Sequence, residues 1–158
     1  MIILRRVVSG VHAHFPARRS EWALGGMMFA TGWILLMPEV TFNPRTPLFV
    51  VLGSVMSENT WGWTCLVFGF GRLGSLIING TFSDTSYSRY SPHVRGGFAF
   101  LSCFFWATIT IGLFAAWRPL FGLGCYPFLL LLEITNVWQA MRDARQADMS
   151  ARDATAGD

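Results

Sequence analysis

Long runs of apolar residues, separated by short polar stretches, are the most regular feature of this chain. A helix needs about 20 predominantly apolar residues to cross a bilayer. The runs predict four membrane-spanning helices, over residues 22–38, 61–80, 97–117 and 120–139. We therefore expect an all-α integral membrane protein, with a four-helix bundle over residues 21–140, a basic segment over residues 1–20 and a charged tail over residues 141–158.

A further apolar stretch, Leu48 to Met56, is too short to cross a bilayer. Thr46 and Pro47 precede it, and these residue types are favoured at the N-cap and the first position of a helix. The pattern predicts a short helix between the first and second spans. Because it is apolar, we expect this helix to lie in the membrane interface on the periplasmic side.

Several polar residues and prolines predict where the spans begin and end. Ser20 is the expected N-cap of the first span, and Glu21 favours a helix start. Pro38 is expected to end or kink that span, and Ser91–Pro92 to form a turn in a polar loop over residues 80–95. Pro127, inside the fourth predicted span, predicts a kink near its outer end.

Composition and charge agree with a membrane location. Hydrophobic residues make up 53% of the chain and charged residues 13%, whereas soluble domains have about 25% charged residues. All 12 basic residues are Arg, which a GC-rich genome explains more simply than a binding role. The chain lacks the alternation of aromatic and basic residues that single-stranded nucleic acids require, so nucleic acid is not an expected partner.

The Arg residues predict the orientation of the spans. Four lie in residues 1–20, two in the 80–95 loop and three in the tail, whereas the opposite side has only Arg45 and Arg118. Basic residues are enriched in cytoplasmic segments of membrane proteins. We expect both termini to lie in the cytoplasm. The chain is expected in a bacterial inner (plasma) membrane or as a membrane-associated phage protein. A lipid bilayer is the expected environment.

Arg72 lies in the middle of the second apolar run, where a charge costs about 2.5–3.5 kcal/mol on insertion scales. Glu133 lies in the fourth run, and the two residues are about 12 Å and 9 Å from the cytoplasmic ends of their spans. They are the only clear acid and base within the predicted spans, so we expect them to pair. Ser75, Asn79 and Asn136 share their helix faces and are expected to complete the hydrogen bonds.

Two roles are open for this predicted cluster. An ion pair can fix the register of packed helices, and buried ionisable groups in membranes are also candidates for a proton or ion path. Transporters usually have internal repeats or broken helices, and the sequence has no convincing repeat. The structural role is therefore favoured.

The second run also contains Gly69, Gly71 and Gly74 in a GxGxxG arrangement. A dinucleotide-binding motif needs a preceding strand within a βαβ unit, and here an apolar helix surrounds the glycines. We expect the three glycines to permit close helix–helix packing.

The sequence contains no arrangement typical of an enzyme or of a metal or cofactor site. Cys65, Cys103 and Cys125 are isolated within apolar runs. His12 and His14 form an HxH pair near the N-terminus, but no further ligand lies nearby, so an interfacial position is the simpler interpretation. Since no nucleophile and base occur together either, we expect a non-enzymatic protein without catalytic residues, cofactor or metal.

Three segments carry a resemblance to known proteins: WGWTCLVFGFGRLGSLIING, SPHVRGGFAFLSCFFW and EITNVWQAMRDAR. They resemble small four-helix integral membrane proteins encoded by phages and prophages of GC-rich proteobacteria. The resemblance covers most of residues 20–145. It implies a viral or prophage origin, and it assigns no catalytic residues.

Three classes of function follow from these observations. The first is a holin-like or lysis-related protein that oligomerises through small-residue helix faces. The second is a membrane anchor or assembly protein with a membrane or virion protein partner. The third is a channel or transporter component that uses Arg72 and Glu133. Each class predicts either a homo-oligomer or a protein partner within the membrane.

Overall fold

The computed structural model describes residues 8–10, 12, 15–81, 87–115 and 121–156. Over these residues the fold is all-helical, so the predicted α class is confirmed for this part of the chain. The elements are η1 (Pro16–Arg18), α2 (Arg19–Leu35), α3 (Pro47–Val55), α4 (Glu58–Thr81), α5 (Tyr87–Ala115), η2 (Phe121–Gly124) and α6 (Tyr126–Ala156).

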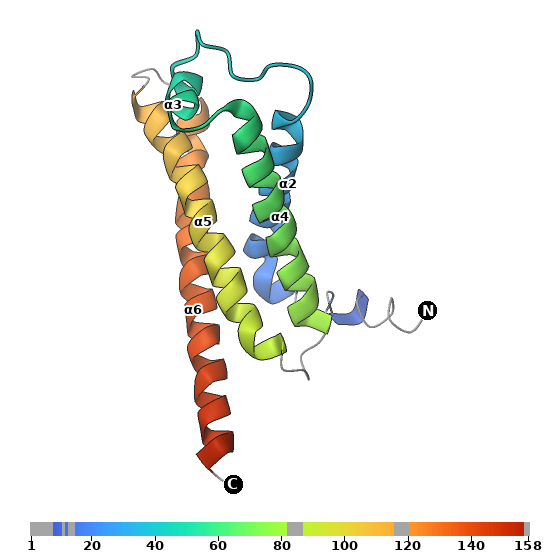
Figure 1. Ribbon diagram of the computed structural model, residues 1–158. Helices are drawn as coiled ribbons and strands as arrows, with labels where there is room; N and C mark the ends of the chain where they lie inside the picture. Colours follow the sequence, from blue (N-terminus) through green and yellow to red (C-terminus); the bar gives the residue numbers. More distant parts are fainter. Residues whose placement is uncertain (1–7, 11, 13–14, 82–86, 116–120, 157–158) are drawn as a thin grey trace.

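The long helices α2, α4, α5 and α6 lie side by side and alternate in direction, and α3 covers one end of them (Figure 1). α2 packs on α4, α5 packs on α6, and α4 joins the two pairs through its contact with α5. We call the end covered by α3 the α3 end. The opposite end, where α2 begins and α6 projects beyond its neighbours, is the tail end.

The structure supports membrane-spanning length and composition for two helices. Residues Glu58–Ile78 of α4 and Tyr90–Ala115 of α5 are long and apolar enough to cross a bilayer. α2 has only 17 residues, and the second half of α6 is rich in Arg and Asp. Of the four spans expected from the sequence, two therefore meet both criteria within the described residues.

Glycines bring α2 and α4 into direct backbone contact. A Cβ atom on Gly32 would lie 2.4 Å from the backbone nitrogen of Leu66, and one on Gly69 would lie 2.4 Å from the backbone nitrogen of Phe29. Gly71 faces α5 instead, because its Cβ would lie 2.4 Å from the ring of Phe98. Gly69 and Gly71 thus have the packing positions expected of them.

The prediction for Gly74 is wrong. A Cβ on Gly74 would have no described atom within 4 Å, so no close helix contact requires a glycine there. Five residues separate it from Gly69, which turns it by about 140° around the helix at 3.6 residues per turn. Gly74 is therefore rotated well away from the face that contacts α2.

The core at the α3 end is aromatic and apolar. Trp61, Phe105 and Trp106 are buried there, and Phe105 packs edge to face on both tryptophans. The indole nitrogen of Trp61 donates a hydrogen bond of 2.9 Å to the carbonyl oxygen of Leu52, which joins α3 to α4. The predicted short helix is confirmed, with Thr46 at its N-cap and Pro47 as its first residue.

Three of the predicted helix boundaries are wrong. Ser20 is not an N-cap, because α2 begins at Arg19, and this helix ends at Leu35, before Pro38. Pro92 lies inside α5, which begins at Tyr87, so the 80–95 region is not wholly a loop. Pro92 is the sixth residue of α5, beyond the first four N–H groups that have no helical partner, so it removes one backbone hydrogen bond from this helix.

Pro127 also differs from its prediction. It is the second residue of α6, which begins at Tyr126. Its missing N–H would have had no partner in the helix, and this removes the reason for a kink.

Candidate functional site

The predicted pair between Arg72 and Glu133 is present in the middle of the bundle. Nη1 of Arg72 on α4 lies 2.5 Å from Oε1 of Glu133 on α6, and both side chains are buried. Asn136 donates from Nδ2 to Oε2 of Glu133 at 3.2 Å. Its Oδ1 accepts a 2.7 Å hydrogen bond from Ser20 of α2. This chain of contacts joins α2, α4 and α6.

A second buried pair lies nearer the tail end and was not expected from the sequence. Arg95 of α5 binds Glu21 of α2 with two hydrogen bonds, of 2.9 Å from Nε and 2.6 Å from Nη2. Its remaining nitrogen, Nη1, lies 3.2 Å from Oδ2 of Asp143 on α6. Arg18 donates to the same oxygen of Asp143, also at 3.2 Å.

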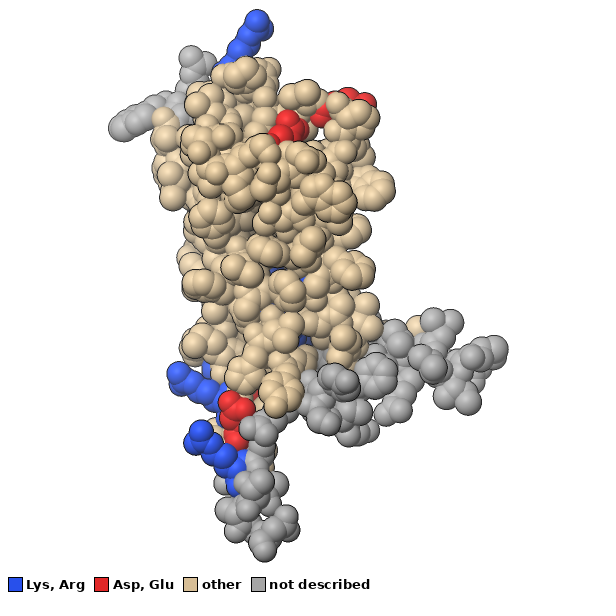
Figure 2. Space-filling view, viewed as in Figure 1, with Lys and Arg blue, Asp and Glu red and all other residues tan. Residues whose placement is uncertain are grey.

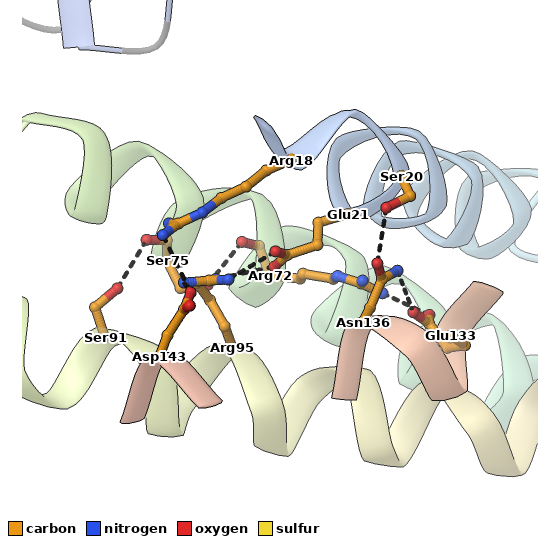
Figure 3. Close-up of polar contacts among 10 residues, drawn as sticks. All are labelled: Arg18, Ser20, Glu21, Arg72, Ser75, Ser91, Arg95, Glu133, Asn136 and Asp143. Carbon is orange, nitrogen blue, oxygen red and sulfur yellow. Dashed lines mark hydrogen bonds and ion pairs between the residues drawn. The ribbon is translucent and has the colours of Figure 1, made fainter. Parts of the chain in front are cut away.

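Together these six charged residues form what we call the ionic layer: Arg18, Glu21, Arg72, Arg95, Glu133 and Asp143. Figure 3 shows that they come from every long helix and meet between the helices. Three positive and three negative groups balance one another. Because a buried charge is costly unless it is paired, this balance lets four of the six stay buried, whereas Arg18 and Asp143 are 20% and 37% exposed.

One predicted member of the cluster, Ser75, does not have its expected role. The hydroxyl of Ser75 donates to the carbonyl oxygen of Arg72 at 2.8 Å, within its own helix, and makes no bond to the guanidinium. The carbonyl oxygen of Ser75 accepts a hydrogen bond of 3.4 Å from Ser91 on α5. A hydroxyl in a helix bonds readily to a carbonyl one turn back, which explains the difference. The side chain of Asn79 lies outside the described residues.

Arg72 and Glu133 are the only acid and base within the predicted spans, but the helices extend beyond those spans and bury Glu21 and Arg95 as well. Glu21 was interpreted as a helix-start residue and Arg95 as part of a loop, because each stands next to an apolar run. The helices continue past those runs, so both side chains turn inward. The available signal was that each charge directly adjoins an apolar segment.

The electrostatic environment differs between the arginines of the layer. Burial lowers the pKa of Arg18 from its usual value, and the nearby Arg95 lowers it further, while Glu21 and Asp143 oppose the shift. Arg72 is less completely bonded than Arg95. Its Nε and Nη2 atoms have no hydrogen-bond partner in the part of the chain that the structure describes.

The geometry of the layer suits a structural element that fixes helix positions. Each guanidinium has its own carboxylate on another helix, so a shift of one helix along its axis would break a pair. Of the HxH pair, His12 is exposed and His14 lies outside the described residues.

No protein-family model, curated protein or solved structure matches this chain. The phage or prophage origin implied by the resemblance of three segments therefore stays a prediction. The function proposed below is therefore inferred from the positions and contacts of this chain's own side chains.

Proposed function

We propose that this protein is a non-enzymatic integral membrane scaffold in which α2, α4, α5 and α6 all cross the bilayer. One observation carries the proposal: polarity is reversed relative to a soluble protein. Arg72 and Glu133 are 1% and 0% exposed, whereas Phe70, Phe100 and Phe128 are 69%, 67% and 63% exposed. Apolar surface of this kind suits lipid, and in water it would favour aggregation.

The surface between the two ends supports the same proposal. In Figure 2 the charged side chains of the visible face gather at the two ends, with a largely uncharged band between them. Large apolar side chains are exposed on each long helix, such as Trp33 on α2 and Leu131 on α6. A lipid-facing belt around all four helices accounts for this distribution.

The lengths of α2 and α6 are compatible with crossing. The 17 residues of α2 measure about 25 Å at 1.5 Å per residue, against a hydrocarbon core of about 30 Å. Leu36 and Met37 extend its apolar end, and a short helix is accommodated by local thinning of the bilayer. In α6, the 14 residues from Tyr126 to Gln139 measure about 21 Å, so η2 would complete this crossing and the rest of α6 would extend into the cytoplasm.

The scaffold role follows from combining a fixed bundle with an extended α6. The balanced ionic layer joins all four long helices. It contacts the middle of α6 through Asp143. Beyond it, α6 continues to Ala156 with alternating Arg and Asp residues. We propose that this projecting helix, on the cytoplasmic side, is the part that a protein partner binds.

A channel or transporter component is a second candidate, favoured by the incomplete bonding of Arg72. Two unpartnered donors in a buried guanidinium are costly, and such groups often mark functional sites in membranes. Against this role stands the aromatic core at the α3 end, where Trp61, Phe105 and Trp106 fill the space along the same axis.

The holin-like class, the first expected from the sequence, loses part of its support. A holin-like protein was expected to oligomerise through small-residue helix faces. Gly32 and Gly69 are instead covered by the contact between α2 and α4 within one chain.

Topology reporters test the membrane part of the proposal. Fusions after residue 42 and after residue 158 of the full chain are expected to give opposite signals, periplasmic and cytoplasmic. Equal signals would contradict an odd number of crossings between the two points.

Membrane potential measured on induction of the chain alone separates the three functions. A scaffold leaves the potential unchanged. Its collapse would identify a lesion-forming protein. A conductance that disappears in Glu133→Gln, with the protein level unchanged, would identify an ion path.

A further inference from the structure

A groove between α5 and α6 lies near the tail end, on the outer side of this helix pair. It has a volume of about 280 Å³, and its lining is mostly apolar. Small and flexible side chains form it: Gly96, Gly97 and Phe100 on α5, and Ala140, Met141 and Ala144 on α6. A Cβ on Gly97 would have no described atom within 4 Å, so the glycine leaves space open.

The surroundings of the groove are positively charged. Arg142 places its guanidinium carbon 4.6 Å from the ring centre of Trp138, and Arg145 lies four residues after Met141, on the same side of the helix. In contrast to the arginines of the ionic layer, neither Arg142 nor Arg145 has a described carboxylate within ion-pair distance. His93, which also lines the groove, lies 3.5 Å from Asp148.

The position of Trp138 indicates the depth of this region. Its indole is 59% exposed and lies between the apolar belt and the first Arg of the tail. Trp is enriched at the level of lipid headgroups. An apolar groove thus leads toward two unpaired arginines at the depth where phosphate groups lie.

We propose that this groove binds an anionic phospholipid, with the headgroup end of one acyl chain in the groove and the phosphate at Arg142 and Arg145. The inference rests on the proposed membrane location. Arginine binds phosphate through charge-assisted hydrogen bonds, and basic pockets between helices on the cytoplasmic side are known to bind anionic lipid headgroups. The unpaired charges favour this occupant over a helix of a second copy, which would bring its own arginines to the same place.

Lipid retention tests the proposal on the full chain. The purified protein is placed in nanodiscs with equal amounts of phosphatidylglycerol and phosphatidylcholine, extracted in mild detergent, and its bound lipid measured by native mass spectrometry. We expect retained phosphatidylglycerol to exceed phosphatidylcholine. Each of Arg142→Gln and Arg145→Gln is expected to lower the preference about five-fold, as the attraction of one basic residue to an anionic membrane implies. Arg45→Gln, at the α3 end, is the charge control and is expected to change nothing.

A second pair of variants tests the groove itself. Gly97→Leu fills it with a side chain and is expected to remove most of the retained lipid. Gly74→Leu is the matched control, because that glycine also has open space around its Cβ and does not line the groove. Both variants keep the arginines in place.

The outcomes separate the lipid site from the membrane location. Equal retention of the two lipids by the wild type, or unchanged retention in Gly97→Leu, would overturn the lipid site while the protein still enters nanodiscs. A dimer that Gly97→Leu dissociates would assign the groove to a second copy. Failure to enter nanodiscs at all would overturn both proposals.

Discussion

The two halves of the bundle are held together by different interactions. At the α3 end, Trp61, Phe105 and Trp106 fill the core with aromatic rings. Toward the tail end, the ionic layer joins the helices with paired charges. In the membrane location that we propose, apolar side chains gain little from packing on one another, because lipid tails are equally apolar. The aromatic half would then be held by shape and dispersion, and the ionic half would determine which helices are neighbours.

The largest expected effect comes from breaking the bidentate pair in the ionic half. Arg95→Ala leaves Glu21 buried without its partner and removes a contact of Asp143. Breaking a buried pair costs about 3–5 kcal/mol in soluble proteins, and access of water to the tail end reduces this figure. We expect the unfolding midpoint in detergent to fall strongly. An unchanged midpoint would show that the ionic layer does not determine the arrangement of the helices.

The pair of Arg72 and Glu133 allows a double-mutant cycle. Arg72→Ala and Glu133→Ala are each expected to lower the folded yield, and the two together to recover part of it. Interacting residues give coupling energies of about 0.5–3 kcal/mol. If the two single effects simply add, the pair contributes nothing to the packing of α4 against α6. A double mutant that folds but has lost a measured conductance would favour the ion path.

A smaller effect is expected where the two halves meet at the contact of α2 with α4. Gly69→Ala places a Cβ 2.4 Å from the backbone nitrogen of Phe29, so the helices must separate. Overpacking of this kind costs about 1–3 kcal/mol. Gly74→Ala, with open space around it, is the matched control and is expected to leave the unfolding midpoint equal or slightly raised. Equal loss in both variants would contradict the close contact.

The smallest effect is expected in the aromatic half. Trp61→Phe keeps an aromatic ring but removes the hydrogen bond to the carbonyl of Leu52. The net contribution of such a bond is about 1 kcal/mol. We expect a small loss of stability and greater accessibility of α3, which a thiol placed at Ser54 measures by its reaction rate. A rate equal to that in the Trp61 protein would show that the bond does not hold α3 in place.

The comparison of the halves also explains which features could be predicted. The apolar runs determine the long helices, and Thr46–Pro47 marks α3, because these signals are local. Arg72 and Glu133 were identifiable since each is a lone charge deep within a run. Glu21 and Arg95 were missed because a charge at the edge of a run has two possible environments, and only the helix start decides between them. The spacing of Gly74 from Gly69 and Gly71 does not indicate that no other helix packs against the Gly74 face of α4.

Collision accessibility of nitroxide labels tests the central claim, that all four helices cross the bilayer with their apolar faces in lipid. Labels at Trp33, Phe70, Phe100 and Phe128 report on α2, α4, α5 and α6 in turn, in a chain whose native cysteines are replaced. In liposomes we expect strong relaxation by oxygen and weak relaxation by a water-soluble nickel complex at all four positions, and the reverse at Arg45. Free access of nickel to the labels on α2 or α6 would contradict the account.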